Sequence, residues 1–125
     1  MAEITVNGRI KIITFQKSFV KVFPYLVPTL RTDDGKGIDH DLTIAGARMK
    51  ANGEYKPSGE SDLSVNGHLT IKGFENRFEQ AFGIKCEICY QKSGRLQKTN
   101  AKFDDMTLAA ANKTLNEEGA EVFDL

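Results

Sequence analysis

The sequence of 125 residues has no tryptophan, only three prolines and two cysteines, and no excess of charge of either sign. Lys and Arg total 17, as do Asp and Glu, so the chain lacks the cationic surplus that drives non-specific nucleic-acid binding. Its apolar runs are a few residues long, whereas a bilayer-spanning helix needs about 20. The start, Met1-Ala2-Glu3, lacks the basic and apolar regions of a signal peptide. We therefore expect a cytoplasmic protein with no membrane partner.

The two cysteines, Cys86 and Cys89, are too few and too close to form the disulfide framework of a small secreted domain. Apolar residues make up 40% of the chain and include eight Phe, which is enough for a hydrophobic core and unlike a disordered tail. The length is typical of one average domain or two very small ones.

An internal repeat is the main signal. An offset of 59 aligns two Asn-Gly segments, the Phe residues after them and, without a gap, the glycines Gly35 and Gly94. After an insertion at 96–100 the match resumes at an offset of 64, from Asp41 onto Asp105. The chain is therefore predicted to contain a first repeat at 1–56, a linker at 57–61 and a second repeat at 62–125.

Each repeat opens with alternating apolar residues around its Asn-Gly pair, Asn7-Gly8 or Asn66-Gly67. This pattern predicts a β-hairpin with a type I′ turn, and a single bent strand with an Asn-Gly bulge is the alternative. Phe at four-residue spacing then predicts a helix with one aromatic face: Phe15, Phe19 and Phe23 in the first repeat, and Phe74, Phe78 and Phe82 in the second. Pro24 and Gly83 should end these helices, and we expect the rings to form the core.

A strand should follow each helix, at 26–30 and at 84–90, and Pro28 favours a sheet edge for the first of them. A Gly-containing loop and a short helix come next, at 43–50 and at 107–115, with Thr43 or Asp41 and Thr107 or Asp105 as N-caps. Residues 121–125 suggest a final strand, and 54–56 its weaker counterpart. The prediction is an α+β fold of two tandem units that share a core or interface, because units of about 60 residues are marginal alone.

This order of elements resembles the β-grasp plan of ubiquitin-like domains, and Asp105-Met106-Thr107-Leu108 looks like the segment before their short helix. The C-terminus, Phe123-Asp124-Leu125, lacks the Gly-Gly tail of conjugated modifiers, so the resemblance does not imply a modifier. Phe82-Gly83-Ile84-Lys85 and Met106-Thr107-Leu108-Ala109 also look similar to segments of small bacterial proteins of unknown function with two such repeats. That resemblance implies the fold and a bacterial source, and no catalytic residue.

The Cys86-x-x-Cys89 motif raises the alternative of a small zinc- or thiol-dependent protein. A redox motif places its first cysteine at a helix N-terminus, whereas this one lies in a predicted strand, where residues three apart face opposite sides. A zinc site needs four ligands, and only His40 and His68 are available besides the cysteines. We expect both thiols to be buried.

The other polar candidates are weaker. Asp39-His40-Asp41 could form an acid/base pair, although helix capping explains Asp41 equally well. The loop Asp33-Asp34-Gly35-Lys36-Gly37 lacks the ligand spacing of an EF-hand and the pattern of a Walker A motif. Lys92, Arg95 and Lys98 form a local basic strip, which leaves weak nucleic-acid binding as a second alternative.

No set of residues supports a catalytic, cofactor or metal site, so none is predicted, and the chain is not expected to be an enzyme. Strands at exposed sheet edges can pair with another chain. The prediction is a module for protein–protein interaction or self-association, with its function sought where the two repeats differ.

Overall fold

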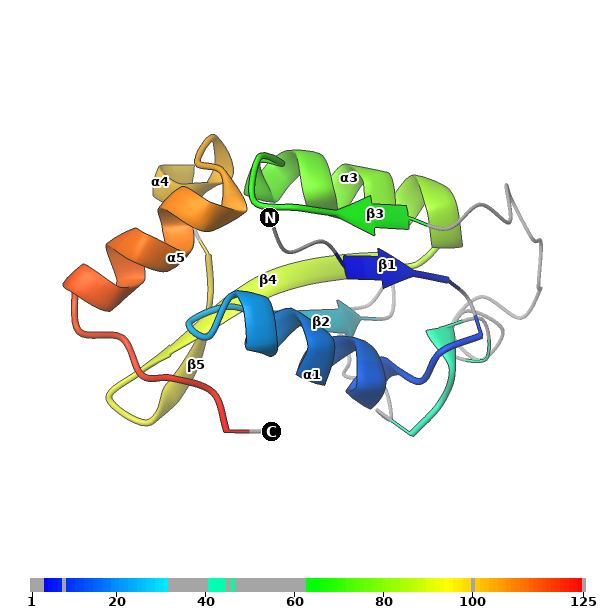
Figure 1. Ribbon diagram of the computed structural model, residues 1–125, viewed down its shortest axis with the longest axis horizontal. Helices are drawn as coiled ribbons and strands as arrows, with labels where there is room; N and C mark the ends of the chain where they lie inside the picture. Colours follow the sequence, from blue (N-terminus) through cyan, green and yellow to red (C-terminus); the bar gives the residue numbers. More distant parts are fainter. Residues whose placement is uncertain are drawn as a thin grey trace.

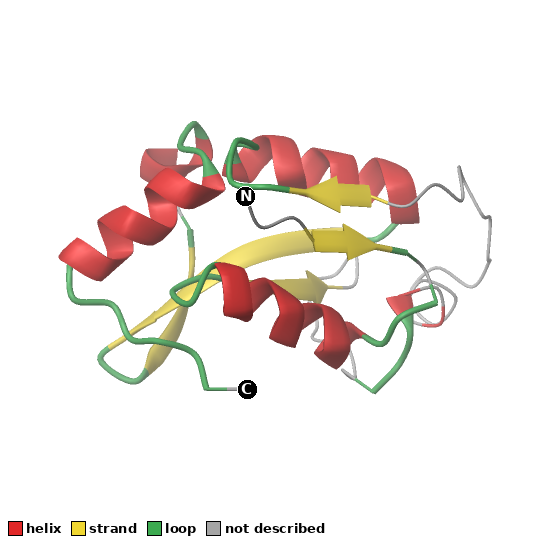
Figure 2. Cartoon of the chain, viewed as in Figure 1, coloured by secondary structure: helices red, strands yellow, loops and turns green. Residues whose placement is uncertain are grey.

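A computed structural model describes residues 4–7, 9–31, 41–44, 46, 63–99 and 101–124 (Figures 1 and 2). These residues form an α+β fold, which confirms the predicted class. The elements in chain order are β1 (Ile4–Val6), α1 (Ile12–Val22), β2 (Val27–Arg31), β3 (Leu63–Val65), α3 (Ile71–Phe82), β4 (Lys85–Lys92), β5 (Arg95–Lys98), α4 (Ala101–Asp104) and α5 (Leu108–Glu117).

The strands form two antiparallel sheets, and both sheets join the two predicted repeats. In the first sheet β1 pairs with β3, so that Thr5 lies opposite Ser64, the residue that the offset of 59 aligns with it. In the second sheet the order is β2-β4-β5, and Thr29 lies opposite Glu87. β2 is thus an edge strand, as the proline within it predicted.

The predicted Asn-Gly hairpins are wrong. Instead of a type I′ turn, the Asn7 side chain accepts a hydrogen bond from the Arg9 N–H, and the Asn66 side chain accepts one from the His68 N–H, each at 2.9 Å. The chain then enters a helix at Ile12 or at its counterpart in the second repeat. Each repeat therefore differs from the β-grasp plan at its first element, where a single strand stands in place of a hairpin.

The reason lies in two competing periodicities. Ile12 lies two residues after Ile10, which fits a strand, but it also lies three residues before Phe15, which fits a helix. In the helix, Ile12 shares one face with Phe15 and Phe19, and all three side chains are fully buried. The backbone of β1 then pairs with β3 rather than with the residues after its own turn.

The predicted helix ends are confirmed. α1 ends at Val22, just before Phe23 and Pro24. α3 ends at Phe82, followed by Gly83 in the left-handed conformation at φ 69°. At the other end of α3, the Thr70 hydroxyl caps the helix by accepting the Gly73 N–H, whereas α1 has no such side-chain cap.

The Phe faces of α1 and α3 pack against each other and form the centre of the core. The Phe15 ring stacks on the Phe78 ring, with 5.7 Å between centroids and 16° between planes. The Phe19 and Phe74 rings are also 5.7 Å apart, and those of Phe15 and Phe74 6.4 Å. One buried cluster contains side chains of both repeats, as expected for a shared core.

The offset of 59 does not continue into the strands. It would match Cys86 to Val27, but Cys86 belongs to the large core cluster and Val27 to a smaller cluster. An offset of 58 instead matches Leu30 to Ile88, which are both in the large cluster. Since a shift of one residue turns a side chain to the other face, the expected gap-free match is wrong. The first repeat has one more residue between helix and strand.

The second repeat contains a hairpin that the sequence did not predict. Three residues of the predicted insertion, 96–98, form β5 together with Arg95, and this strand pairs with β4 across the turn at Ser93 and Gly94. These two residues have φ of 55° and 74°, as a two-residue type I′ turn requires. The hairpin projects at one end of the molecule, beside the C-terminal residues (Figure 1).

The short helix of the second repeat is confirmed as α5, and the Thr107 hydroxyl caps it by accepting the Ala110 N–H. Its counterpart at 43–50 is described only in part, with Thr43 accepting the Gly46 N–H in the same way. The predicted final strand is reduced to one bridge between Glu121 and Gln91, and 54–56 lie outside the described residues. Within the described ranges, no helix is long and apolar enough to cross a membrane.

Candidate functional site

The Cys86-x-x-Cys89 motif lies in β4, and its two thiols face opposite sides of the sheet. Cys86 is part of the large core cluster, while Cys89 packs with Val20 and Val27 in the smaller one. Neither cysteine is joined in a disulfide, and both are buried, as expected. Burial raises the pKa of the Cys86 thiol well above its usual range, so this group stays protonated and unreactive at neutral pH.

This arrangement does not favour the zinc or redox alternative. In the part of the chain that the structure describes, no three His, Cys, Asp or Glu side chains are grouped as metal ligands would be. His68 is exposed in the turn after β3. The other candidates, His40 and the acidic loop at 33–37, fall outside the described residues. No specific observation supports a thiol or zinc function.

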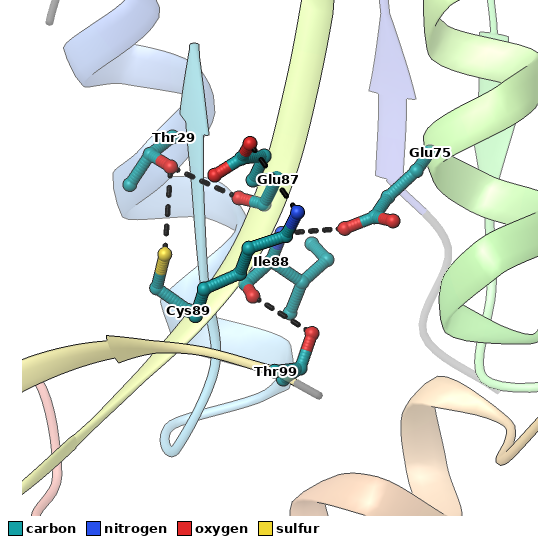
Figure 3. Close-up of polar contacts among 7 residues, drawn as sticks. Thr29, Glu75, Glu87, Ile88, Cys89 and Thr99 are labelled. Carbon is teal, nitrogen blue, oxygen red and sulfur yellow. Dashed lines mark hydrogen bonds and ion pairs between the residues drawn. The ribbon is translucent and has the colours of Figure 1, made fainter. Parts of the chain in front are cut away.

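The side chain of Phe123 packs on the smaller cluster that contains Cys89, and its effect on this thiol can be tested. The half-buried side chain of Phe123, near the C-terminus, packs on the cluster that contains Cys89, and its backbone N–H bonds to Pro24 O at 3.0 Å. The Thr29 hydroxyl lies 3.5 Å from Cys89 Sγ (Figure 3). Phe123 is a half-buried side chain on the outside of the cluster that contains this thiol.

We expect Phe123→Ala to speed the alkylation of Cys89 by a thiol reagent several-fold, while Cys86 stays protected in the main core. Val122→Ala is the matched control, because the Val122 side chain is mostly exposed and should leave the rate unchanged. Mass-spectrometric mapping of the modified cysteine would measure both rates. Equal rates in the wild type and in Phe123→Ala would show that Phe123 does not shield this thiol.

A half-buried carboxylate that the sequence did not indicate lies beside β4, on the side of β5 and just beyond the last residue of β5. Glu75 of α3 accepts the Ile88 N–H at 2.9 Å, and the Ile88 carbonyl accepts both the backbone N–H and the hydroxyl of Thr99 (Figure 3). Both polar groups of Ile88 thus bond away from β2. Pro28, which lies opposite Ile88, therefore sits at a non-hydrogen-bonded pair, where its missing N–H costs no ladder bond.

The aligned residue of the first repeat, Gln16, has the matching role at β2. Its side-chain nitrogen donates to Pro28 O at 2.9 Å, and the side chain is buried. One copy thus uses a neutral amide and the other a carboxylate to bond the strand after the helix, on the side that faces away from the other repeat's strand. Burial raises the pKa of Glu75, and the hydrogen bond from Ile88 and the charge of Lys98 only partly oppose this.

We expect Glu75→Gln to stabilise the protein at neutral pH by less than about 1 kcal/mol, since solvent partly screens a half-buried group. A raised pKa in the folded state means that the stability contributed by Glu75 is fully present below its usual pKa of 4.5. That contribution is lost as the pH rises through the raised value, because folding then disfavours the ionised form. An amide oxygen still accepts the Ile88 N–H but carries no charge.

Urea unfolding of the wild type and Glu75→Gln between pH 4 and 8 would measure this difference. Glu79→Gln, an exposed change on the same helix, is the control and should leave the curve unaltered. A variant less stable than the wild type at neutral pH would contradict the prediction, because the charge itself would then stabilise the fold.

The basic strip is divided by the hairpin. Lys92 and Arg95 lie opposite each other beside the turn, so their side chains share one face. Lys98 is on the other face, where its ammonium lies 3.4 Å from the Glu87 carboxylate. On the face of Lys92, the hydrogen bond from Lys102 lowers the pKa of Glu118, and the charge of Lys92 contributes further. The three cations therefore do not form one continuous strip for nucleic acid.

All four side chains of β5 are exposed, and Leu96 has 51% of its surface accessible. β5 is the last strand of its sheet, so no other strand within the described ranges pairs with its outer edge. The sequence predicted a basic loop here and not the strand, although the Ser93-Gly94 dipeptide is a turn signal.

Comparisons of the chain with protein-family models, with curated proteins and with solved structures gave no match.

Proposed function

We propose that the protein is a non-enzymatic binding module that pairs the outer edge of β5 with a strand of a partner protein. The observation that carries the proposal is the exposed strand at the end of a three-stranded sheet, with an apolar side chain, Leu96, at its middle. An exposed strand edge is a ready template for an added strand.

The register identifies which backbone groups would bind. In a hairpin with a two-residue turn, the flanking pair, Lys92 and Arg95, is hydrogen-bonded, and the pairs then alternate along the ladder. Gln91, opposite Leu96, is therefore at a non-hydrogen-bonded pair, and its carbonyl indeed accepts the Glu121 N–H on the side away from β5. By the same alternation, Leu96 and Lys98 direct their N–H and C=O groups outward.

We propose that the two repeats form the scaffold and that β5 binds the partner. We infer that they are a fused pseudo-symmetric pair, since Thr5 faces its counterpart Ser64 and Thr29 faces Glu87, its counterpart at an offset of 58. Their contacts with each other build the core. The residues of β5 from Leu96 onward lie in the insertion at 96–100, so they can serve binding without a cost to the shared scaffold.

The test is an affinity capture from an extract of the source cell with three forms of the full chain. Leu96→Pro removes one outward N–H without breaking a bond to β4, while Leu96→Thr keeps that N–H and a residue suited to strands. We expect the wild type and Leu96→Thr to retain a partner protein that Leu96→Pro loses. Capture that is equal with all three forms, or no captured protein, would contradict the proposal.

A further inference from the structure

We propose that the strand that docks on β5 is an acidic, extended segment of another protein, in which carboxylates alternate with apolar side chains. This inference rests on the proposed docking function and specifies the chemistry of the partner. The carboxylates would meet Arg95, with Lys92 one strand farther in, and an apolar side chain would cover Leu96.

The charges beside the turn support an anionic partner. Lys92 and Arg95 are directly opposite each other, and like charges in that position destabilise a hairpin. Among the residues that the structure describes, neither makes an ion pair. Of the described carboxylates near this end of the molecule, Glu118 bonds to Lys102 and Glu121 bonds to the Gly94 N–H. The hairpin therefore presents two adjacent cations to a ligand.

The alternation of β5 gives the pattern that a docked strand would need. Arg95 and Gln97 lie on the face of Lys92, whereas Leu96 and Lys98 lie on the other face. Lys98 already has the Glu87 carboxylate as its ion-pair partner. On the first face an incoming strand thus meets positive charge, and on the second it meets the exposed Leu96. Acidic and apolar residues in alternation match both faces.

The hairpin already holds one segment of this kind on its other edge. Residues 121–124 read Glu-Val-Phe-Asp, and Glu121 donates its N–H to Gln91 O at 2.8 Å. Its side chain accepts the Gly94 N–H of the turn, while Phe123 packs in the smaller cluster. In this contact within the chain, the acidic side chain of an extended segment bonds to the turn, while its apolar side chain packs on a buried cluster.

The same charges disfavour a second copy of the chain as the occupant. Pairing of two β5 edges would bring two copies of Arg95 and of Lys98 close together. Their repulsion disfavours this pairing, just as basic residues on natural edge strands prevent edge-to-edge association. The carboxylates of an acidic strand are instead attracted to these basic side chains. The geometry therefore favours a different protein over self-association through this edge.

The test uses a displayed library of random octapeptides selected on the immobilised full chain. We expect the enriched peptides to alternate Asp or Glu with apolar residues. A synthetic peptide of the enriched sequence should bind at least about tenfold more weakly to Arg95→Glu than to the wild type, because an acidic ligand then meets a like charge on the docking strand itself. Lys85→Glu, an exposed change at the far end of β4, is the matched control and should bind normally.

Arg95→Glu also separates lost recognition from unfolding. It places a carboxylate opposite Lys92, which should stabilise the hairpin, so lost binding with an unchanged or higher melting temperature reports charge recognition rather than unfolding.

The remaining outcomes separate the two proposals. Enrichment of neutral or basic peptides that bind Leu96→Thr but not Leu96→Pro would overturn the acidic partner and leave strand docking in place. Failure to enrich any peptide, or enriched peptides that bind Leu96→Pro as tightly as the wild type, would overturn docking on β5 itself. A dimer in sedimentation that Leu96→Pro dissociates would identify a second copy as the occupant and overturn the inference.

Discussion

Replacement of Phe15 by alanine is expected to lower the free energy of unfolding by about 3–5 kcal/mol, the usual cost of removing a buried Phe side chain from a core. The Phe15 ring is fully buried and contacts the rings of Phe19, Phe74 and Phe78, so its loss opens a cavity at the junction of α1 and α3. Since small domains are stable by about 5–15 kcal/mol, this change alone removes a large part of the total.

Chemical denaturation followed by circular dichroism would measure the loss. Phe15→Leu keeps most of the apolar volume and should cost clearly less than alanine. Lys17→Ala changes an exposed residue of the same helix and should alter the stability by no more than about 0.5 kcal/mol. A cost below about 1 kcal/mol for Phe15→Ala would mean that the rings do not form the centre of the core.

The two predicted repeats, produced separately as residues 1–56 and 62–125, are expected to be largely unfolded in dilute solution. β1 has its strand partner, β3, in the other repeat, and β2 pairs with β4 across the same division. Each fragment would also expose the Phe face that the other covers, and fragments of this size bury little surface of their own.

Mixing the two fragments should restore folded structure, because all contacts between β1 and β3 and between α1 and α3 form between separate segments of the chain. Amide proton dispersion in NMR spectra of each fragment and of the mixture would measure this. Well-dispersed spectra from both fragments alone, unchanged on mixing, would refute the shared core.

The helices were predictable because their signals are local. The spacing of Phe74, Phe78 and Phe82 specifies one face of α3, and Gly83 specifies its end, without reference to the rest of the chain. The Thr107 cap and the α5 helix follow from residues close together in the sequence in the same way. The edge position of β2 was predictable from Pro28, since proline cannot donate to a sheet ladder.

The candidate site was predictable only in its charges. Lys92, Arg95 and Lys98 stand out in the sequence, but their division between two faces depends on β5 pairing with β4. The Glu75 contact with Ile88 likewise joins a helix and a strand whose packing no local pattern specifies. The thiols of Cys86 and Cys89 were expected to be buried on opposite faces of a strand, and strand alternation was sufficient for that prediction.

The sequence by itself determined the apolar faces, the helix ends and the α+β class, because periodicity and capping depend on neighbouring residues. Only the tertiary structure decided which strands pair and in which register. The apolar alternation of Ile4 and Val6 is compatible both with a local hairpin and with pairing to β3, which begins 59 residues later. The fold adopts the second, because it allows Ile12 to join the Phe face of α1 and both repeats to bury their rings together.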